Sequence, residues 1–243
     1  CGLLAGGGYA ERVLLNEHLA LPIPERMSYE QAAAIPEAFL TAFQALVWLA
    51  ELQEGEAVLV HAGGSGVGTA AIQLARGLGA RVYVTASEPK HPLCLELGAD
   101  HAIDYRSEDF AAEIRRLTKG RGVQVILDFI GAAYLKQNLE ALALDGRLVL
   151  LALMGGAKVP DFSLLPLLRK RLKLMGSTLR NRSLEYKIAL THAFKTFAWQ
   201  GFADGTYRPV IDSVFPWTEV AQAHRRMEAN LNQGKIVLRV GDE

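Results

Sequence analysis

Cysteine is scarce in this chain, which has only Cys1 and Cys94 among its 243 residues. Two cysteines are too few for a disulfide framework or for a zinc site built from cysteines. The scarcity is typical of proteins from a reducing compartment, so we expect a cytoplasmic protein.

Net charge and long apolar runs are also lacking. Lys plus Arg and Asp plus Glu both number 26, which disfavours a nucleic-acid partner or an anionic membrane surface. The longest apolar run, residues 148–154, is far short of the roughly 20 residues that span a bilayer. The first residue is Cys1 rather than Met, and a Gly-rich turn follows at once, so we expect that sequence upstream is missing. A small-molecule partner is the remaining expectation.

A phosphate-binding lysine is absent from the most distinctive stretch, "VLVHAGGSGVGTAAIQLAR" at residues 58–76. A nucleotide P-loop requires Gly-Lys-Ser/Thr at its end, whereas here Gly68 is followed directly by Thr69. This excludes the usual phosphoryl-transfer loop. A Gly-rich turn between an apolar run and a helix still favours an anion at the helix N-terminus.

From Glu56 to about residue 180, six short apolar runs alternate with helical patterns. Such alternation predicts βαβ units and a parallel sheet, an α/β fold of the doubly wound Rossmann type. The helices carry the usual end signals, with Gly79 after the first and Ser107 as the expected cap of a later one. Residues 1–35 have strand-and-turn patterns, and residues 183–243 combine a helix, a turn and a final strand. We read these flanks as pieces of a second domain into which the α/β block is inserted.

The glycine turn fits a dinucleotide fingerprint in two registers. Gly63, Ser65 and Gly68 follow the strand directly but have serine in the middle, while Gly66, Gly68 and Ala71 begin three residues late. We favour the first because it places the bend where the strand ends. A merely tight connection is the alternative, and it is disfavoured by the position of the turn at the first of six strands.

The end of the second strand, "VYVTASEPK", lacks the carboxylate that binds the ribose of NAD. Ser87, Lys90 and Tyr105 can donate to a 2′-phosphate instead, which favours NADPH. Glu88 is a contrary observation, and Lys90 could also be an ordinary solvated surface charge.

Ordered blocks along the whole chain, among them "LLAGGGYAE", "AAAIPEAFLTAFQAL", "LGADHAIDY", "GRLVLLALMGG" and "AHRRMEANLNQGKIVLRV", resemble a known family. The chain is similar to medium-chain dehydrogenase/reductases of the quinone oxidoreductase branch, closest to the p53-inducible type. The resemblance implies a Rossmann domain at 36–180, with parts of an incomplete, β-rich GroES-like catalytic domain at 1–35 and 181–243.

The resemblance also implies a set of cofactor contacts. They are Thr41 against the nicotinamide; Gly63, Ser65, Gly66, Val67 and Gly68 at the pyrophosphate; Ser87, Lys90 and Tyr105 at the 2′-phosphate; and Phe129, Leu153, Met154, Thr178, Leu179, Arg180 and Lys235 along the ribose and nicotinamide. Core packing is the alternative for Phe129 and Leu153.

Two departures from the family matter. The residues that shape its substrate pocket are expected upstream, so the catalytic residues are unknown. Zinc-dependent relatives have a cysteine four residues before the position of Thr41, where this chain has Glu37, so we expect no metal. His61 is expected to be structural, and Asp128 to cap local backbone.

The resemblance implies a zinc-independent NADPH:quinone oxidoreductase acting on a quinone or an activated enone. An enoyl-thioester reductase of the same fold and a non-catalytic NADPH-binding protein, such as a crystallin-like protein or a sensor, are the alternatives. The apolar segments "GRLVLLALM" and "LKLMGSTL" favour a homodimer formed through a sheet edge.

Overall fold

The computed structural model describes residues 1–241, which form two compact units. Unit 1 comprises Cys1–Ala42, Ser65–Ala70 and the described residues from Leu179 onward, and unit 2 comprises Phe43–Gly64 and Ala71–Thr178.

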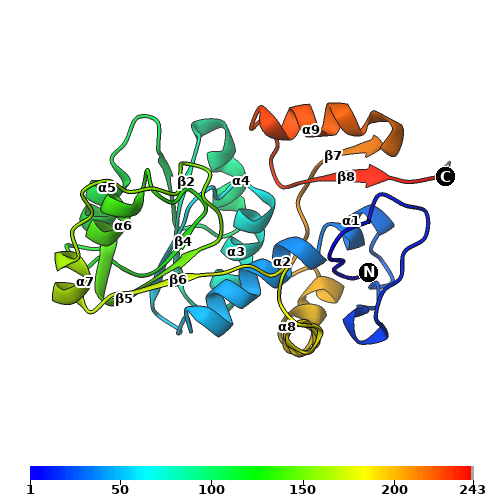
Figure 1. The fold of residues 1–243 in the computed structure, drawn as a ribbon, viewed down its shortest axis with the longest axis horizontal. Helices are drawn as coiled ribbons and strands as arrows, with labels where there is room; N and C mark the ends of the chain where they lie inside the picture. Colours follow the sequence, from blue (N-terminus) through cyan, green and yellow to red (C-terminus); the bar gives the residue numbers. More distant parts are fainter. Residues whose placement is uncertain (242–243) are drawn as a thin grey trace. The chain divides into compact units, whose positions relative to one another are not determined.

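Unit 2 contains a six-stranded sheet in the order β3-β2-β1-β4-β5-β6, and each pair of neighbouring strands is parallel (Figure 1). This is the doubly wound order with its topological switch between β1 and β4. The predicted α/β class and six strands are confirmed. The strands are β1 Ala57–Val60, β2 Arg81–Ala86, β3 His101–Asp104, β4 Val123–Asp128, β5 Leu142–Leu150 and β6 Lys173–Gly176.

The strands form because their branched apolar residues are covered on both faces of the sheet. Every residue of β1 is buried, as are five of the six residues of β2. On one face, Leu59, Ile103 and Ile126 pack with Phe110 and Ile114 in a single core cluster. Runs of this kind are typical of parallel sheets between helices.

Helices connect the strands: α3 Gly66–Gly77, α4 His91–Glu96, α5 Phe110–Leu117, α6 Leu135–Ala141 and α7 Leu165–Lys170. Gly79 follows α3 with φ +77°, as its position predicts. The predicted cap at Ser107 is wrong. Asp109 caps α5 by accepting hydrogen bonds from the amides of Ala111 and Ala112, because its side chain stands directly before the first helical residue.

Unit 1 is built around α8, whose buried Phe194 and Phe202 pack with Phe39 of α2. Strands β7 and β8 pair in parallel and are joined through α9. Helix α8 and strand β8 confirm the helix and the final strand predicted within residues 183–243. The elements are α1 Tyr29–Ala33, α2 Pro36–Phe43, α8 Leu184–Asp204, β7 Ile211–Pro216, α9 Val220–Glu228 and β8 Lys235–Arg239; short helical turns lie at Glu17–Leu19, Gln44–Leu49, Glu88–Lys90 and Trp217–Glu219.

The strand pattern expected in residues 1–35 does not form strands. These residues contain only a short helical turn at Glu17–Leu19 and helix α1. Cys1 and Leu21 exchange one pair of backbone hydrogen bonds, each of 2.8 Å. A strand needs a continuing ladder of such bonds, and among the described residues no strand pairs with this segment.

One helical stretch, Tyr29–Leu49, is long and apolar enough by composition to cross a membrane, with a mean hydropathy of 1.5. However, 67% of its apolar window is buried within the protein. This burial is typical of a core helix in a globular domain, whose apolar face is covered by protein rather than by lipid.

Candidate functional site

The turn after β1 combines an unusual backbone conformation at one residue with close packing at the next. Ala62 has φ +49°, so the bend itself is at an alanine rather than at a glycine. Gly63 serves close packing instead, since an added Cβ would lie 2.8 Å from Val84 Cβ and 3.2 Å from Cys94 Sγ. Burial raises the pKa of the Cys94 thiol to about 11, while Lys90 opposes the rise, so this cysteine stays protonated and inert.

Gly64 gives room to a lysine in unit 2. A Cβ at Gly64 would lie 2.7 Å from Cδ of Lys90, so the aliphatic part of Lys90 passes directly over the glycine turn. Buried Ser87 precedes the short helical turn that carries Lys90, and its carbonyl accepts the Lys90 amide at 2.8 Å. Lys90, one of the three residues predicted at the 2′-phosphate, therefore lies beside the turn.

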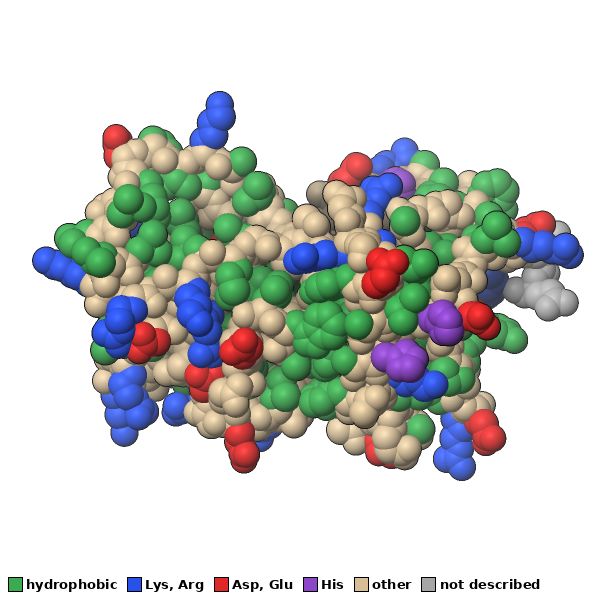
Figure 2. All heavy atoms as spheres, turned by 60° about the horizontal axis from the view of Figure 1, so that its bottom comes forward, with side chains coloured by type: hydrophobic (Ala, Val, Ile, Leu, Met, Phe, Trp, Pro, Cys, Tyr) green, Lys and Arg blue, Asp and Glu red, His purple; other side chains and the backbone are tan. Residues whose placement is uncertain are grey.

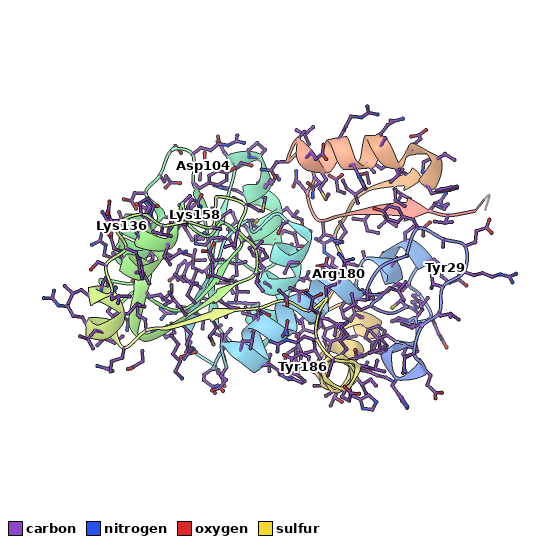
Figure 3. The ribbon with its side chains drawn as sticks, in the orientation of Figure 1. Tyr29, Asp104, Lys136, Lys158, Arg180 and Tyr186 are labelled. Atoms are coloured by element: carbon purple, nitrogen blue, oxygen red, sulfur yellow. The ribbon has the colours of Figure 1, made fainter. Side chains whose placement is uncertain are left out.

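Tyr105 and Asp104 lie at the end of β3, beside the end of β2. Asp104, labelled in Figure 3, pairs with Ala86 in the sheet register, one residue before Ser87. This acid was missed by the sequence reasoning. Its oxygens accept hydrogen bonds from the Arg106 amide and the Ser107 hydroxyl, which compensate part of its charge. Tyr105 is 36% exposed, with the Arg106 guanidinium 5.8 Å from its ring centroid.

The loop after β4 is connected to the loop after β5. Met154 N donates to the Phe129 carbonyl at 3.1 Å, Gly155 N to Ile130 at 2.7 Å, and Ala132 N to Gly156 at 2.9 Å. Phe129 is buried, whereas Leu153 and Met154 are exposed. Core packing, the alternative to a cofactor contact, is therefore consistent with Phe129 but not with Leu153. The two loops that carry these three predicted residues form one connected structure at the carboxyl end of the sheet.

A buried polar chain supports this connected loop. Asp128 Oδ1 accepts from the amides of Ile130 at 2.7 Å and Gly131 at 3.1 Å, so its expected backbone-capping role is confirmed. Asp128 Oδ2 accepts from Nδ2 of Asn138 at 3.0 Å. Asn138 is fully buried on α6, and sequence reasoning gave no signal for it.

The proton positions along this chain follow from its donors. Because Asn138 uses its amide nitrogen toward Asp128, its Oδ1 accepts from Nε2 of His61 at 2.7 Å. His61 Nδ1 then accepts from the Thr85 hydroxyl at 2.9 Å. Burial lowers the pKa of His61, and the Asp128 charge and the Asn138 hydrogen bond only partly oppose this, so the ring is neutral at pH 7. His61 is structural, as expected.

In unit 1, two distant stretches of the chain meet at the N-terminus of α3. The Ser65 hydroxyl accepts the Gly68 amide at 3.0 Å and so caps the helix. Ser65 forms a parallel bridge with Gly234, and a Cβ at Gly66 would collide with Cδ of Lys235. The side chain of Lys235 therefore lies directly against Gly66.

Lys235 also connects to helix α2. Its Nζ lies 2.7 Å from Glu37 Oε2, and Thr41 is one helical turn beyond Glu37. Val67 belongs to the first turn of α3. Arg180, labelled in Figure 3, is exposed, and its guanidinium lies 3.7 Å from a Cβ placed on Gly6; Leu179 is buried and Thr178 is exposed.

These features fit a dinucleotide cofactor. Glycines 63, 64 and 66 stand where a Cβ would collide with neighbouring atoms. Lys90 lies against the turn in unit 2, and Lys235 lies against it in unit 1. Helix amides and lysine ammonium groups are donors that suit phosphate. No group of three or more His, Cys, Asp or Glu side chains that could hold a metal occurs in residues 1–241. The expectation of no zinc remains a prediction.

Comparison with known families matches residues 66–195 to the model described as zinc-binding dehydrogenase. The matched range is more than half of the chain. The chain belongs to the zinc-binding dehydrogenase family. This places it in the medium-chain dehydrogenase/reductase superfamily, as its sequence blocks predict.

Two curated relatives illustrate the range of proteins that contain this family. The human quinone oxidoreductase is 30% identical over 234 residues, covering 96% of this chain and 69% of the relative. A mycocerosic acid synthase-like polyketide synthase of Mycobacterium tuberculosis is 34% identical over 240 residues, covering 98% of this chain. This chain spans only 11% of that synthase.

Two solved structures share the fold. The quinone oxidoreductase from Thermus thermophilus, solved also in complex with NADPH, has a TM-score of 0.86 and 36% identity, covering 98% of this chain and 75% of its own. The CurK enoyl reductase has a TM-score of 0.79 and 31% identity, covering 92% of this chain and 66% of its own. The family is thus one of oxidoreductases that use nicotinamide cofactors.

Proposed function

We propose that this chain binds NADPH and takes part in the reduction of a quinone or an activated enone. The observation that carries the cofactor part is Lys90, whose side chain passes over Gly64 beside the buried Ser87. A cation there attracts the 2′-phosphate of NADPH. NADH has an uncharged ribose hydroxyl at that position, so the same cation adds little to its binding free energy.

The proposed cofactor contacts are those predicted from the sequence. In unit 2 they are Gly63, Ser87, Lys90, Tyr105, Phe129, Leu153, Met154 and Thr178, and in unit 1 they are Thr41, Ser65, Gly66, Val67, Gly68, Leu179, Arg180 and Lys235. As functional domains we propose 36–180 for the nucleotide and 1–35 with 181–243 for part of the catalytic domain. The catalytic residues remain unassigned.

A bound nicotinamide would supply the hydride, and the residues of this chain would bind the cofactor and orient it. The connected loops at Phe129 and Met154, held through Asp128, provide a rigid support at the carboxyl end of β4 and β5. Rigid positioning of reactants lowers the entropic cost of reaching the transition state. No ionisable side chain among these residues is needed as an acid in this proposal.

The second candidate function is the reduction of an enoyl thioester. It is supported by the similarity to the CurK enoyl reductase. A non-catalytic NADPH-binding protein is the third possibility. All three would share the cofactor residues, so cofactor binding alone does not separate them.

The test is NADPH oxidation by the full-length protein with a soluble quinone, compared with an enoyl-thioester acceptor. The proposal expects quinone-dependent turnover well above the thioester rate. The reverse ratio would favour the second candidate. Tight NADPH binding without turnover on either acceptor would favour the third.

We further propose that turnover needs no metal. Glu37 stands at the position of the cysteine in zinc-dependent relatives, and here it forms an ion pair with Lys235. Prolonged chelation should leave the rate unchanged. Loss of activity that zinc restores would contradict this.

We also propose a cytoplasmic homodimer. Strand β6 is an edge strand of the sheet of unit 2, so its outer backbone groups can pair with a second copy. Sedimentation at several concentrations measures this directly, and a monomer throughout would refute it.

A further inference from the structure

A pocket of about 500 Å³ opens in unit 2 at the end of the sheet opposite the proposed cofactor contacts. It is lined by residues 120–122, which precede β4, by the first residues of β5, and by helix α7. The cofactor residues of this unit follow the carboxyl ends of the strands. The pocket is therefore separate from them. Its volume lies within the roughly 300–1,000 Å³ typical of small-molecule sites.

One wall of the pocket is apolar and partly exposed. Leu142 and Ala143 are buried at its base, while Leu144 is 61% exposed and Leu165 is 47% exposed. Figure 2 shows hydrophobic side chains beside basic ones toward its left end, where α7 lies in Figure 1. Exposed apolar surface around a concave site is a common mark of ligand binding.

The other wall is basic. Glu140 is the single acid among the lining residues. Four cations line the pocket: Arg115, Arg121, Arg169 and Lys170. Lys170 has a structural role, because its ammonium donates to the carbonyls of Leu139, Glu140 and Leu142 at 2.8, 2.9 and 2.7 Å. Burial lowers the pKa of Lys170, with Arg115 adding to the effect.

The three arginines remain as possible anion ligands. Arg115 approaches Glu140 only to 3.7 Å, and Nε of Arg121 donates to the Thr118 carbonyl at 3.3 Å. Arg169 is exposed on α7, one turn after Leu165. Guanidinium groups match the planar fork of a carboxylate.

We propose that this pocket binds a small amphipathic anion, a carboxylate with an apolar chain. The carboxylate pairs with Arg121 and Arg169, and the chain covers Leu144 and Leu165. Charge complementarity selects the anion, and the exposed leucines select a chain over a simple inorganic ion.

The test is a calorimetric titration of the full chain with decanoate below its micelle concentration, beside decanol. Amide NMR shifts locate the bound molecule. The proposal expects saturable decanoate binding with shifts confined to residues such as Gly120, Leu144 and Arg169. Decanol should bind at least about threefold more weakly, the scale of a partly exposed ion pair.

Three variants sharpen the result. Arg121→Gln with Arg169→Gln should weaken decanoate about tenfold and leave decanol unchanged, since two exposed pairs are lost. Leu165→Ser should weaken both ligands. Arg225→Gln on α9 removes the same charge from unit 1 and should change neither. Thermal melts verify that each variant is folded.

Equal affinity for decanol and decanoate, or an unaffected double arginine variant, would overturn the proposal. Binding to phosphatidylserine vesicles without binding of free decanoate would also overturn it and identify a membrane surface instead. The same amide shifts appearing on concentration alone would identify a second copy of the chain as the occupant.

Discussion

The two ends of the sheet in unit 2 differ in how they hold polar groups. At the carboxyl end, Asp128, Asn138, His61 and Thr85 are buried and joined by hydrogen bonds. At the amino end, Arg115 and Arg169 are exposed beside exposed leucines. A buried satisfied chain costs stability when one member is lost, whereas an exposed charge costs little. The buried polar residues at the carboxyl end should therefore be sensitive to substitution, whereas the exposed Arg115 and Arg169 at the amino end should tolerate it.

The strongest break of this comparison is Asn138→Leu. It leaves His61 and Asp128 without a shared partner inside the core, so we expect a loss of about 3 kcal/mol in the free energy of unfolding. Urea unfolding measures it.

Gln137→Leu is the matched control, because the neighbouring Gln137 bonds at the surface to Asp109 and should change stability by less than about 0.5 kcal/mol. Equal losses of unfolding free energy in the two variants would show that the buried hydrogen bonds of Asn138 contribute no more to stability than a surface hydrogen bond.

A second prediction compares two glycines of the same turn. Gly63→Ala should destabilise by about 2 kcal/mol, because the new Cβ meets branched, buried Val84 at 2.8 Å. Gly66→Ala meets only the flexible stem of Lys235, so its unfolding free energy should change by less than about 1 kcal/mol. Thermal or urea unfolding of both variants decides, and a reversed order would contradict the packing argument.

These two predictions mark the limit of what the sequence could reveal. The six strands, their helices and the Gly-rich turn could be predicted, because unbroken apolar runs and end signals are local. The partner Asn138 and the approach of Lys235 to Gly66 could not, since each depends on residues that are separated in the chain. The bend at Ala62 could not either, because positive φ is uncommon for a residue other than glycine. Asp104 was missed because the sheet register, rather than sequence spacing, places it beside Ala86.

The third prediction concerns pH. Burial lowers the pKa of His61 below its ordinary value of 6.5, so the unfolded chain takes up a proton that the folded chain excludes. The stability from neutral His61 is present above pH 6.5 and falls as the pH drops below it, by at most about 1.4 kcal/mol per pH unit. Urea midpoints between pH 5 and 8 measure the slope. His61→Gln should flatten it, and an unchanged slope would exclude His61 as its source.

The most direct test of the cofactor proposal is the affinity of NADPH and NADH for the chain and for Lys90→Ala, measured by calorimetry. Lys136→Ala, an exposed lysine on α6, is the control. The account predicts tighter binding of NADPH to the unmodified chain. It also predicts that Lys90→Ala weakens NADPH by about 1–3 kcal/mol and leaves NADH nearly unchanged. Equal losses for both cofactors, or an initial preference for NADH, would contradict a 2′-phosphate site at Lys90.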